Sequence, residues 1–168
     1  MTTSCADCGC TGVRMNRLQQ CAHPSCCCAA TPIQVIETLA ARVRVAMETI
    51  DLTEMAELLA PDARWGAPER DVPTCRSAKE ILSWYEIARE NGVRASVTEV
   101  DVIGEHIVVG LRIIAPKDAA SPSRISARWQ VLSVEDGRIG EIRGYETRRD
   151  ATAFATSGVS RWKASRHR

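Results

Sequence analysis

The sequence predicts an α+β domain in which three helices precede a curved, cone-shaped antiparallel sheet. Three observations support this prediction. Apolar residues recur at three- and four-residue steps after residue 31, helix-capping residues precede these stretches, and β-branched and aromatic residues dominate after Gly92. We expect the domain to span residues 31–155, between a cysteine-rich leader (1–30) and a basic tail (156–168).

The first helix is predicted over residues 32–50. Thr31 is a favourable N-cap residue, and Pro32 suits the first helical position because an N–H group there has no partner within the helix. The apolar residues that follow share one face, which must be buried against another element. They are Ile33, Ile36, Ala40, Val43, Met47 and Ile50.

A second, shorter helix is predicted to begin at Asp51. Glu54 stands three residues later, as is typical of a capped N-terminus, and the sequence Ala60-Pro61-Asp62 ends the helix. A short strand is expected at 63–67. The helix residues expected to face inward are Leu52, Met55, Leu58 and Leu59.

A third helix is predicted after a proline-containing loop. Ser77 and Glu80 form a capping-box pattern at its start, and Asn91-Gly92 ends it. The residues expected to face inward are Ile81, Trp84, Tyr85 and Ala88.

Four strands are predicted after the third helix. Hairpin-length turns occur at Gly104-Glu105 and at Asp136-Gly137. Strands joined by such turns are antiparallel neighbours, so the four should form a meander with the first helix lying across it. The predicted strands are 93–103, 106–115, 125–134 and 139–147.

Seven of the eight cysteines fall within the first 28 residues, and they predict a soft-metal site. They form two clusters, Cys-x-x-Cys-x-Cys and Cys-x-His-x-x-Cys-Cys-Cys, in a segment too poor in apolar residues to fold by burial alone. Thiolates with one imidazole suit Zn(II) or Cu(I). The expected ligands are Cys5, Cys8, Cys10, Cys21, His23, Cys26, Cys27 and Cys28.

The second cluster resembles the Cys-x-His-x-x-Cys-x-Cys signature of bacterial metallothioneins, and the first is similar to their Cys-x-x-Cys-x-Cys element. This resemblance implies metal binding or sequestration. A disulfide framework and a leader without a specific role stay open as alternatives. The N-terminus has neither the basic nor the apolar region of a signal peptide, which favours a cytoplasmic protein with reduced thiols.

Composition and charge argue against several classes of function. The chain has 168 residues, of which 45% are hydrophobic, and a formal net charge of +1, so it has no general attraction for nucleic acid or anionic membranes. No apolar run approaches the length of a membrane span. The basic ending at 161–168 is expected to be a solvated tail. We expect no organic cofactor.

The order of elements and two local sequences resemble the nuclear transport factor 2-like superfamily. The two sequences are DLTEMAELLAPDARW at 51–65 and VEDGRIGEIRGY at 134–145, and the similarity spans residues 32–155. The superfamily includes SnoaL-like polyketide cyclases and ketosteroid isomerases, besides members that bind ligands or form dimers. The resemblance therefore implies a homodimer and an interior that holds a small hydrophobic molecule.

The resemblance also allows a test for ketosteroid isomerase chemistry. That reaction needs a carboxylate base, a phenol and a protonated carboxylic acid, and these positions fall at Ala67, Val43 and Trp129. None of the three side chains transfers a proton, which favours binding over isomerase activity. Two alternatives stay open: an enzyme of the cyclase, isomerase or dehydratase type acting on a small hydrophobic substrate, and a dimerisation module without catalysis.

The ligand pocket is expected to contain aromatic residues and one carboxylate. Strand alternation counted from Trp129 places Ile142 and Glu146 on the same inner face. Glu146 is a candidate general base, with a solvated carboxylate as the alternative. The predicted pocket residues are Trp65, Trp84, Tyr85, Trp129, Ile142 and Glu146, and the aromatic ones also fit an ordinary hydrophobic core.

Other reactive or charged residues are expected to be structural. Cys75 is interpreted as a lone structural thiol and His106 as a turn-exposed side chain. Arg112 and Arg128 are expected to form ion pairs on an outer face, with an anion site inside the cone as the alternative. Their expected partners are Glu99, Asp101 or Glu141.

Overall fold

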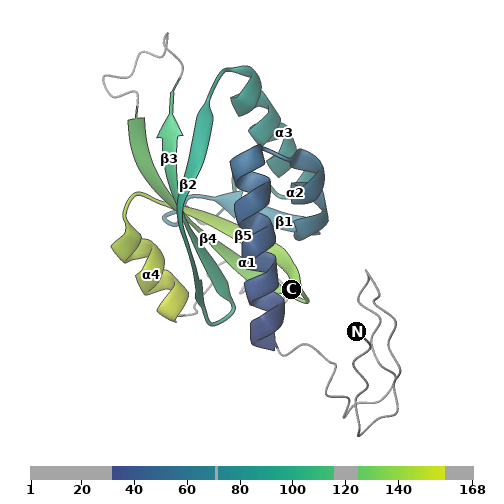
Figure 1. Cartoon of the computed structure of the whole chain (residues 1–168), viewed down its shortest axis with the longest axis vertical. Coiled ribbons are helices and arrows are strands. Elements are labelled where there is room, and N and C mark those ends of the chain that lie inside the picture. Colours follow the sequence, from purple (N-terminus) through teal and green to yellow (C-terminus); the bar gives the residue numbers. More distant parts are fainter. Residues whose placement is uncertain (1–31, 71, 116–124, 158–168) are drawn as a thin grey trace, which may run out of the picture. The chain divides into compact units, whose positions relative to one another are not determined.

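The computed structural model describes residues 32–70, 72–115 and 125–157, and within these ranges it has four helices and five strands (Figure 1). The predicted α+β class is confirmed. The predicted leader lies outside the described residues. The elements are α1 (Pro32–Thr49), α2 (Leu52–Leu58), β1 (Leu59–Gly66), α3 (Ala78–Glu90), β2 (Arg94–Ile103), β3 (His106–Ile114), β4 (Ile125–Glu135), β5 (Arg138–Tyr145) and α4 (Arg148–Ser157).

The capping residues identified in the sequence begin two of the helices as predicted. The Asp51 carboxylate accepts hydrogen bonds from two backbone N–H groups in the first turn of α2, both at 3.0 Å. The Ser77 hydroxyl accepts one from the Glu80 N–H at 3.2 Å. Gly92 follows α3 with a φ of 77°, a left-handed conformation that glycine adopts without steric cost.

The apolar face of α1 is close to the predicted one. Ile33 is an exception, because it is 67% exposed, and Met47 is only partly buried. Two residues that the prediction omitted, Leu39 and Ala46, complete the inward face. The buried stripe is Ile36, Leu39, Ala40, Val43 and Ala46.

The boundary between α2 and β1 differs from the prediction. The helix ends at Leu58, and Leu59 already has an extended backbone, so the strand begins four residues earlier than expected at 63. Pro61 therefore lies inside β1. A proline is tolerated there because β1 is an edge strand whose pairing with β5 is interrupted between Leu59 and Arg64.

The sheet is mixed, with the strand order β1-β5-β4-β3-β2. The predicted four-strand antiparallel meander is confirmed over β2 to β5, and β1 adds a parallel edge strand next to β5. Asp136 and Gly137 have φ values of 50° and 73° and connect β4 to β5, as expected for a tight hairpin.

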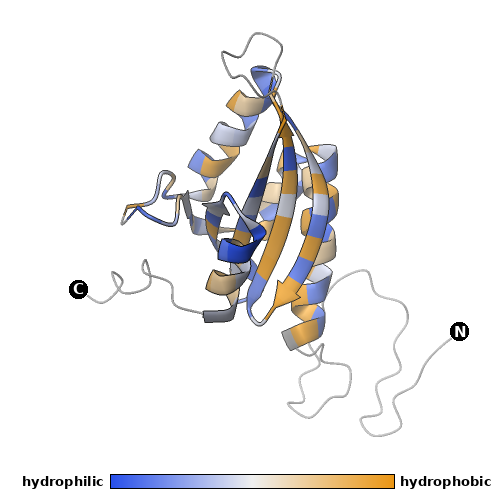
Figure 2. Ribbon diagram, turned by 90° about the vertical axis from the view of Figure 1, so that its left-hand side faces the viewer, coloured by the Kyte–Doolittle hydropathy of each residue, from blue (hydrophilic) through white to orange (hydrophobic). Residues whose placement is uncertain are grey.

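The two faces of the sheet are covered by different helices (Figure 1). On one face, Ile107, Leu132 and Ile142 contact a core to which α1, α2 and α3 contribute. On the other, Val108 and Val131 pack with α4. Successive residues of a strand point to opposite faces, and Figure 2 shows orange and blue bands along the strands toward the viewer.

The helix α4 was not predicted, and the domain boundary expected at 155 falls inside it. Its apolar content is low, because only small alanines and one phenylalanine face the sheet. The overlooked signal is a capping pattern at Thr147 and Asp150. The Asp150 N–H donates to Thr147 Oγ1 at 3.2 Å, and the Thr147 hydroxyl donates to Asp150 Oδ2 at 2.7 Å.

Candidate functional site

A cavity of about 1150 Å³ lies between the helices α1 to α3 and the sheet. Its inner wall is apolar and comes from four elements. The wall residues include Ala46 and Met47 of α1, Met55 of α2, Ala95 of β2, and Leu111 and Ile113 of β3. A wall of this composition favours ligands that bury apolar surface.

Three aromatic residues form one side of the cavity. Trp65 and Trp84 lie with ring centroids 4.3 Å apart, and Trp84 and Tyr85 are 5.5 Å apart in an edge-to-face arrangement. Trp84 is 43% exposed and Tyr85 is partly buried. All three were predicted pocket residues, and the structure places all three along this cavity.

The backbone around Trp65 is held on both sides. β1 pairs Trp65 with Ile142 of β5. On its other side an isolated bridge joins it to Cys75, with Trp65 N to Cys75 O at 3.0 Å and Cys75 N to Trp65 O at 2.9 Å. The buried Cys75 therefore helps to fix the position from which the indole enters the cavity.

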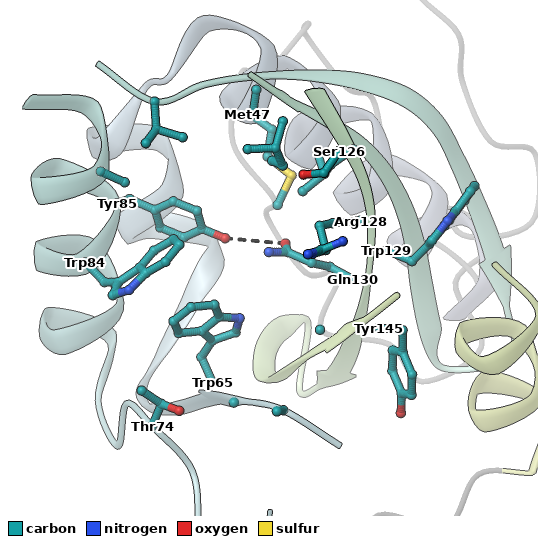
Figure 3. A pocket seen from close by; sticks show the side chains of 18 of the residues that line it. Met47, Trp65, Thr74, Trp84, Tyr85, Ser126, Arg128, Trp129, Gln130 and Tyr145 are labelled. Atoms are coloured by element: carbon teal, nitrogen blue, oxygen red, sulfur yellow. Dashed lines mark hydrogen bonds between the residues drawn. The ribbon is translucent and has the colours of Figure 1, made fainter. Parts of the chain in front are cut away.

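The polar interior of the cavity centres on Tyr85 and Gln130 (Figure 3). The Tyr85 hydroxyl donates a hydrogen bond to Gln130 Oε1 at 3.4 Å. Burial raises the pKa of Tyr85 above its ordinary value of 10, and the hydrogen bond to Gln130 opposes this. The phenol is thus neutral at physiological pH. Ser126 and Arg128 precede Gln130 at alternate positions of β4 and also line the cavity.

Gln130 was missed by the sequence analysis. The sequence analysis placed Trp129 on the inner face of β4, whereas the even-numbered residues next to it occupy that face. The pattern of Ser126, Arg128 and Gln130 at every second position was the available signal. The sequence analysis instead gave more weight to Trp129, because large aromatic residues are expected to face the interior.

Trp129 and Ile142 lie on opposite faces of the sheet. Trp129 pairs with Tyr145, while Ile142 pairs with Leu132 and is fully buried in the core. The Trp129 ring lies against Gly110 on the face covered by α4, where the Arg148 guanidinium is 5.9 Å from its centroid. Trp129 reaches the edge of the cavity. The expectation that Trp129, Ile142 and Glu146 share one face is wrong.

Glu146 lies at the rim of the cavity with 84% of its side chain exposed, 4.0 Å from Arg128. The Glu146 carboxylate is therefore solvated, which was the alternative to a general base. Described lining residues of both charges surround the opening, three acidic and three basic, and all six are exposed. They are Glu69, Arg70, Arg89, Arg128, Glu146 and Asp150.

The three residues at the positions that ketosteroid isomerase chemistry requires do not lie together in the structure. Val43 is fully buried in the core, Ala67 lines the cavity, and Trp129 belongs to the other face of the sheet. None of them brings an ionisable group to the cavity. Among the lining residues that the structure describes, every carboxylate is exposed.

A second polar cluster lies beneath α4. His106, expected at an exposed turn, is buried, and its Nδ1 forms a 3.1 Å hydrogen bond with Ser133 Oγ. Phe154 of α4 covers it, with ring centroids 5.7 Å apart. Arg143 donates to Glu141 in a buried ion pair. The prediction of an exposed His106 failed because α4 was not anticipated.

The predicted ion pairs of Arg112 and Arg128 are also wrong. Glu99 and Asp101 both accept hydrogen bonds from Arg148 of α4, and Glu141 accepts one from Arg143. Arg128 approaches Glu146 instead. Arg112 is exposed.

The predicted metal ligands, Cys5 to Cys28, lie outside the described residues. Across 32–70, 72–115 and 125–157, no group of three or more His, Cys, Asp or Glu side chains is placed to hold a metal ion. Cys75 is a buried free thiol, and burial raises its pKa above the ordinary value of 9. In the same ranges no helix combines the length and apolar content needed to cross a bilayer.

No protein-family model and no curated protein matches this sequence. Solved structures match its fold. A protein of Jannaschia sp., provisionally named a SnoaL-like polyketide cyclase, is 18% identical with a TM-score of 0.55, over 79% of this chain and 99% of that one. A protein of Kribbella flavida, provisionally named a ketosteroid isomerase, is 16% identical with a TM-score of 0.55, over 68% and 79%.

A third similar structure, from Xanthomonas campestris, is described as having a cystatin-like fold. It is 22% identical with a TM-score of 0.54, over 70% of this chain and 95% of that one. At these identities the likeness concerns the fold. The chain therefore has the nuclear transport factor 2-like α+β fold that its sequence predicted, and one of the similar structures describes its own fold as cystatin-like.

Proposed function

We propose that this chain is a small-molecule-binding domain whose cavity holds an apolar ligand. The observation that supports this best is the cavity itself. Its volume of about 1150 Å³ lies just above the range of roughly 300–1,000 Å³ that is common for ligand pockets. Its wall is apolar and aromatic, and few polar groups point into it. Pockets with this combination bury hydrophobic molecules and use the polar groups to orient them.

Binding is favoured over catalysis because no described lining residue brings a buried carboxylate or imidazole into the cavity. The carboxylates among the described lining residues are exposed, and Tyr85 is a neutral phenol with a raised pKa. His106 and Glu141, which do carry titratable groups, are buried under α4. An enzyme of the kind that the Jannaschia and Kribbella names describe is the alternative.

A blocking substitution tests the proposal. Ala95 lines the cavity, whereas its neighbour Ser96 is exposed. We expect Ala95→Trp to weaken binding of the neutral fluorescent probe N-phenyl-1-naphthylamine by roughly tenfold or more, and Ser96→Trp to leave it unchanged. Equal probe affinity in the two variants would show that the probe binds elsewhere.

We also propose that the cysteine-rich leader binds Zn(II) or Cu(I). The support is the sequence, in which seven thiols and the imidazole of His23 occur within residues 5–28 at spacings that let them converge on one or two ions. Elemental analysis of protein purified under reducing conditions tests this. We expect bound metal in the intact chain and a clear loss when Cys26, Cys27 and Cys28 are all replaced by Ser. Unchanged metal content would contradict it.

A homodimer is a further proposal, which the family resemblance supports. Analytical ultracentrifugation of the full chain measures the mass directly. A monomer at every concentration would contradict both the dimer and the alternative of a dimerisation module.

A further inference from the structure

Arg128 places a positive charge on the inner face of the sheet. β3 pairs Arg128 with Leu111, whose buried side chain belongs to the core beneath the helices. Side chains of directly paired residues lie on the same face of a sheet, so Arg128 faces the cavity, and Figure 3 shows it on the side of β4 that carries Gln130. The other five charged residues among the described lining residues lie in loops or helices.

The contacts of the Arg128 guanidinium leave donors for a ligand. One hydrogen bond goes to the backbone oxygen of Ala127 at 3.0 Å, whereas a guanidinium carries five N–H groups. The Glu146 carboxylate lies 4.0 Å from Arg128 Nη2, which is too far for a hydrogen bond, and its side chain is 84% exposed. Exposed ion pairs of this kind contribute little to stability, so a negatively charged ligand can replace Glu146 at low cost.

The surroundings of Arg128 favour a ligand with a single negative charge. The three acidic and three basic lining residues balance each other, and a second ligand charge would meet no other cation on the strands that line the cavity in the described part of the chain. A carboxylate accepts two parallel hydrogen bonds from a guanidinium. Leu111, Ile113 and Ala95 continue the wall from Arg128, so the remainder of the ligand is apolar.

We propose that the ligand of this cavity is an apolar molecule with one carboxylate group, and that Arg128 binds this carboxylate. The inference rests on the proposed small-molecule binding and adds the charge of the ligand. The apolar body lies along the wall of Met47, Leu111 and Ile113, where burial supplies most of the affinity. The pairing with Arg128 selects anions over neutral molecules of the same shape.

Two probes of nearly equal shape test the proposal. 2-Naphthoate carries a negative charge at neutral pH, and 2-naphthamide replaces its carboxylate by an uncharged amide. Calorimetric titration gives both dissociation constants for the full-length protein and for Arg128→Gln. We expect the preference for naphthoate over naphthamide to fall roughly fivefold or more in the variant, with the affinity for naphthamide largely kept. An unchanged preference would overturn the proposal.

Arg112→Gln is the matched control, because it removes the same charge from the other face of the sheet. Arg112 pairs with Ala127, next to Arg128, but it is exposed and does not line the cavity. We expect this variant to keep the preference for naphthoate. An equal fall in both variants would mean that the net charge of the protein, and not a contact with Arg128, attracts the anion.

A substitution of Glu146 gives an independent result with the opposite sign. Glu146→Gln removes the carboxylate that competes for Arg128. We expect the affinity for naphthoate to rise roughly twofold and the affinity for naphthamide to stay the same. A lower affinity for naphthoate would contradict the displacement of Glu146 by the ligand.

The two proposals fail in different ways. If naphthamide and the naphthylamine probe bind, and the preference for naphthoate is the same with and without Arg128, small-molecule binding stands and the role of Arg128 is wrong. If neither naphthalene compound binds, and the naphthylamine probe does not bind either, the cavity does not take apolar molecules and both proposals are overturned.

Discussion

Polar side chains of this chain differ in whether they have a hydrogen-bond partner. Tyr85 and Gln130 form a hydrogen bond with each other, and Asp51 accepts one from the first turn of a helix. The Tyr145 hydroxyl, by contrast, is buried with no hydrogen-bond partner among the residues described. Such a group lowers stability, and removing it costs little.

We expect Tyr145→Phe to be neutral at pH 7 or to raise the free energy of unfolding by up to about 1 kcal/mol. Burial raises the pKa of Tyr145 from 10 to about 12. The unfolded chain therefore releases this proton first, and stability is lost as the pH rises from about 10 toward 12. Urea unfolding across this range should show a smaller loss in the variant. The same loss of stability at alkaline pH in both proteins would show that Tyr145 does not cause it. The loss that remains in the variant is expected from Tyr85, whose pKa is also raised.

Gly110 leaves room for the Trp129 ring next to β3. A Cβ atom built at Gly110 would lie 2.7 Å from that ring and 2.8 Å from Thr98 Oγ1, whereas one at Gly144 meets nothing within 4 Å. We expect Gly110→Ala to lower the free energy of unfolding by roughly 1–3 kcal/mol, and Gly144→Ala to change it by less than about 1 kcal/mol in either direction. Chemical denaturation of both variants provides the measurement, and similar values for the two would contradict the steric explanation.

Glu146 is expected to tolerate substitution, because its side chain is 84% exposed. Glu146→Gln should change the free energy of unfolding by no more than about 0.5 kcal/mol. It should also leave the affinity for the naphthylamine probe unchanged. A marked loss of binding, or of any activity found later, would show that the carboxylate acts on the ligand.

Among the elements, α4 is tied to the sheet by several contacts of one side chain. Arg148, at its first position, donates hydrogen bonds to Glu99 and Asp101 of β2, both at 2.7 Å, and its guanidinium lies above Trp129. These contacts join α4 to the strand at the far edge of the meander. They also explain why so short and polar a helix is held on the sheet, together with the buried faces of Ala151 and Ala155.

We expect Arg148→Gln to increase amide hydrogen exchange throughout α4, whereas Arg149→Gln should not, because the described contacts to β2 come from Arg148. The effect should depend on pH. The hydrogen bond from Arg148 lowers the pKa of Glu99, whereas the hydrogen bond with Glu99 raises the pKa of Asp101. The stabilisation from Glu99 is present above its unfolded pKa and is lost as the pH falls through its folded pKa, and the contribution of Asp101 has the opposite pH dependence. Equal protection in both variants would contradict the role of Arg148.

Across the whole molecule, the described part of the chain buries a core of its own. Every residue of the two buried clusters lies between Ile36 and Ala155. The helices and strands of this range bury apolar surface against each other on both faces of the sheet, which is the main source of folding stability. The leader, by contrast, is composed chiefly of thiols and of small or polar residues.

We therefore expect a chain that begins at Thr31 to keep the thermal unfolding midpoint of the full-length protein while losing its bound Zn(II) or Cu(I). Differential scanning calorimetry and elemental analysis of both proteins measure the two effects separately. A midpoint lowered by more than a few degrees would show that the leader contributes to the core.

The α+β class, two of the helix starts and the four-strand meander could be predicted from the sequence. These features depend on local chemistry, since capping hydrogen bonds span three residues and hairpin turns two. The sequence also indicated the aromatic side of the cavity, because Trp65, Trp84 and Tyr85 were predicted to line a pocket and all three line this cavity, with Trp84 at an exposed position.

The remaining features depend on contacts between distant parts of the chain and could not be predicted from the sequence. The face of β4 that lines the cavity depends on its register with β5, and a shift of one residue exchanges Trp129 for Gln130. The burial of His106 and the ion pairs of Glu99 and Glu141 depend on α4, whose own sequence is weakly apolar. The lack of a described hydrogen-bond partner for Trp65 Nε1 could not be predicted from the sequence either. Whether a donor has an acceptor is a property of its neighbours in space, and these come from distant parts of the chain.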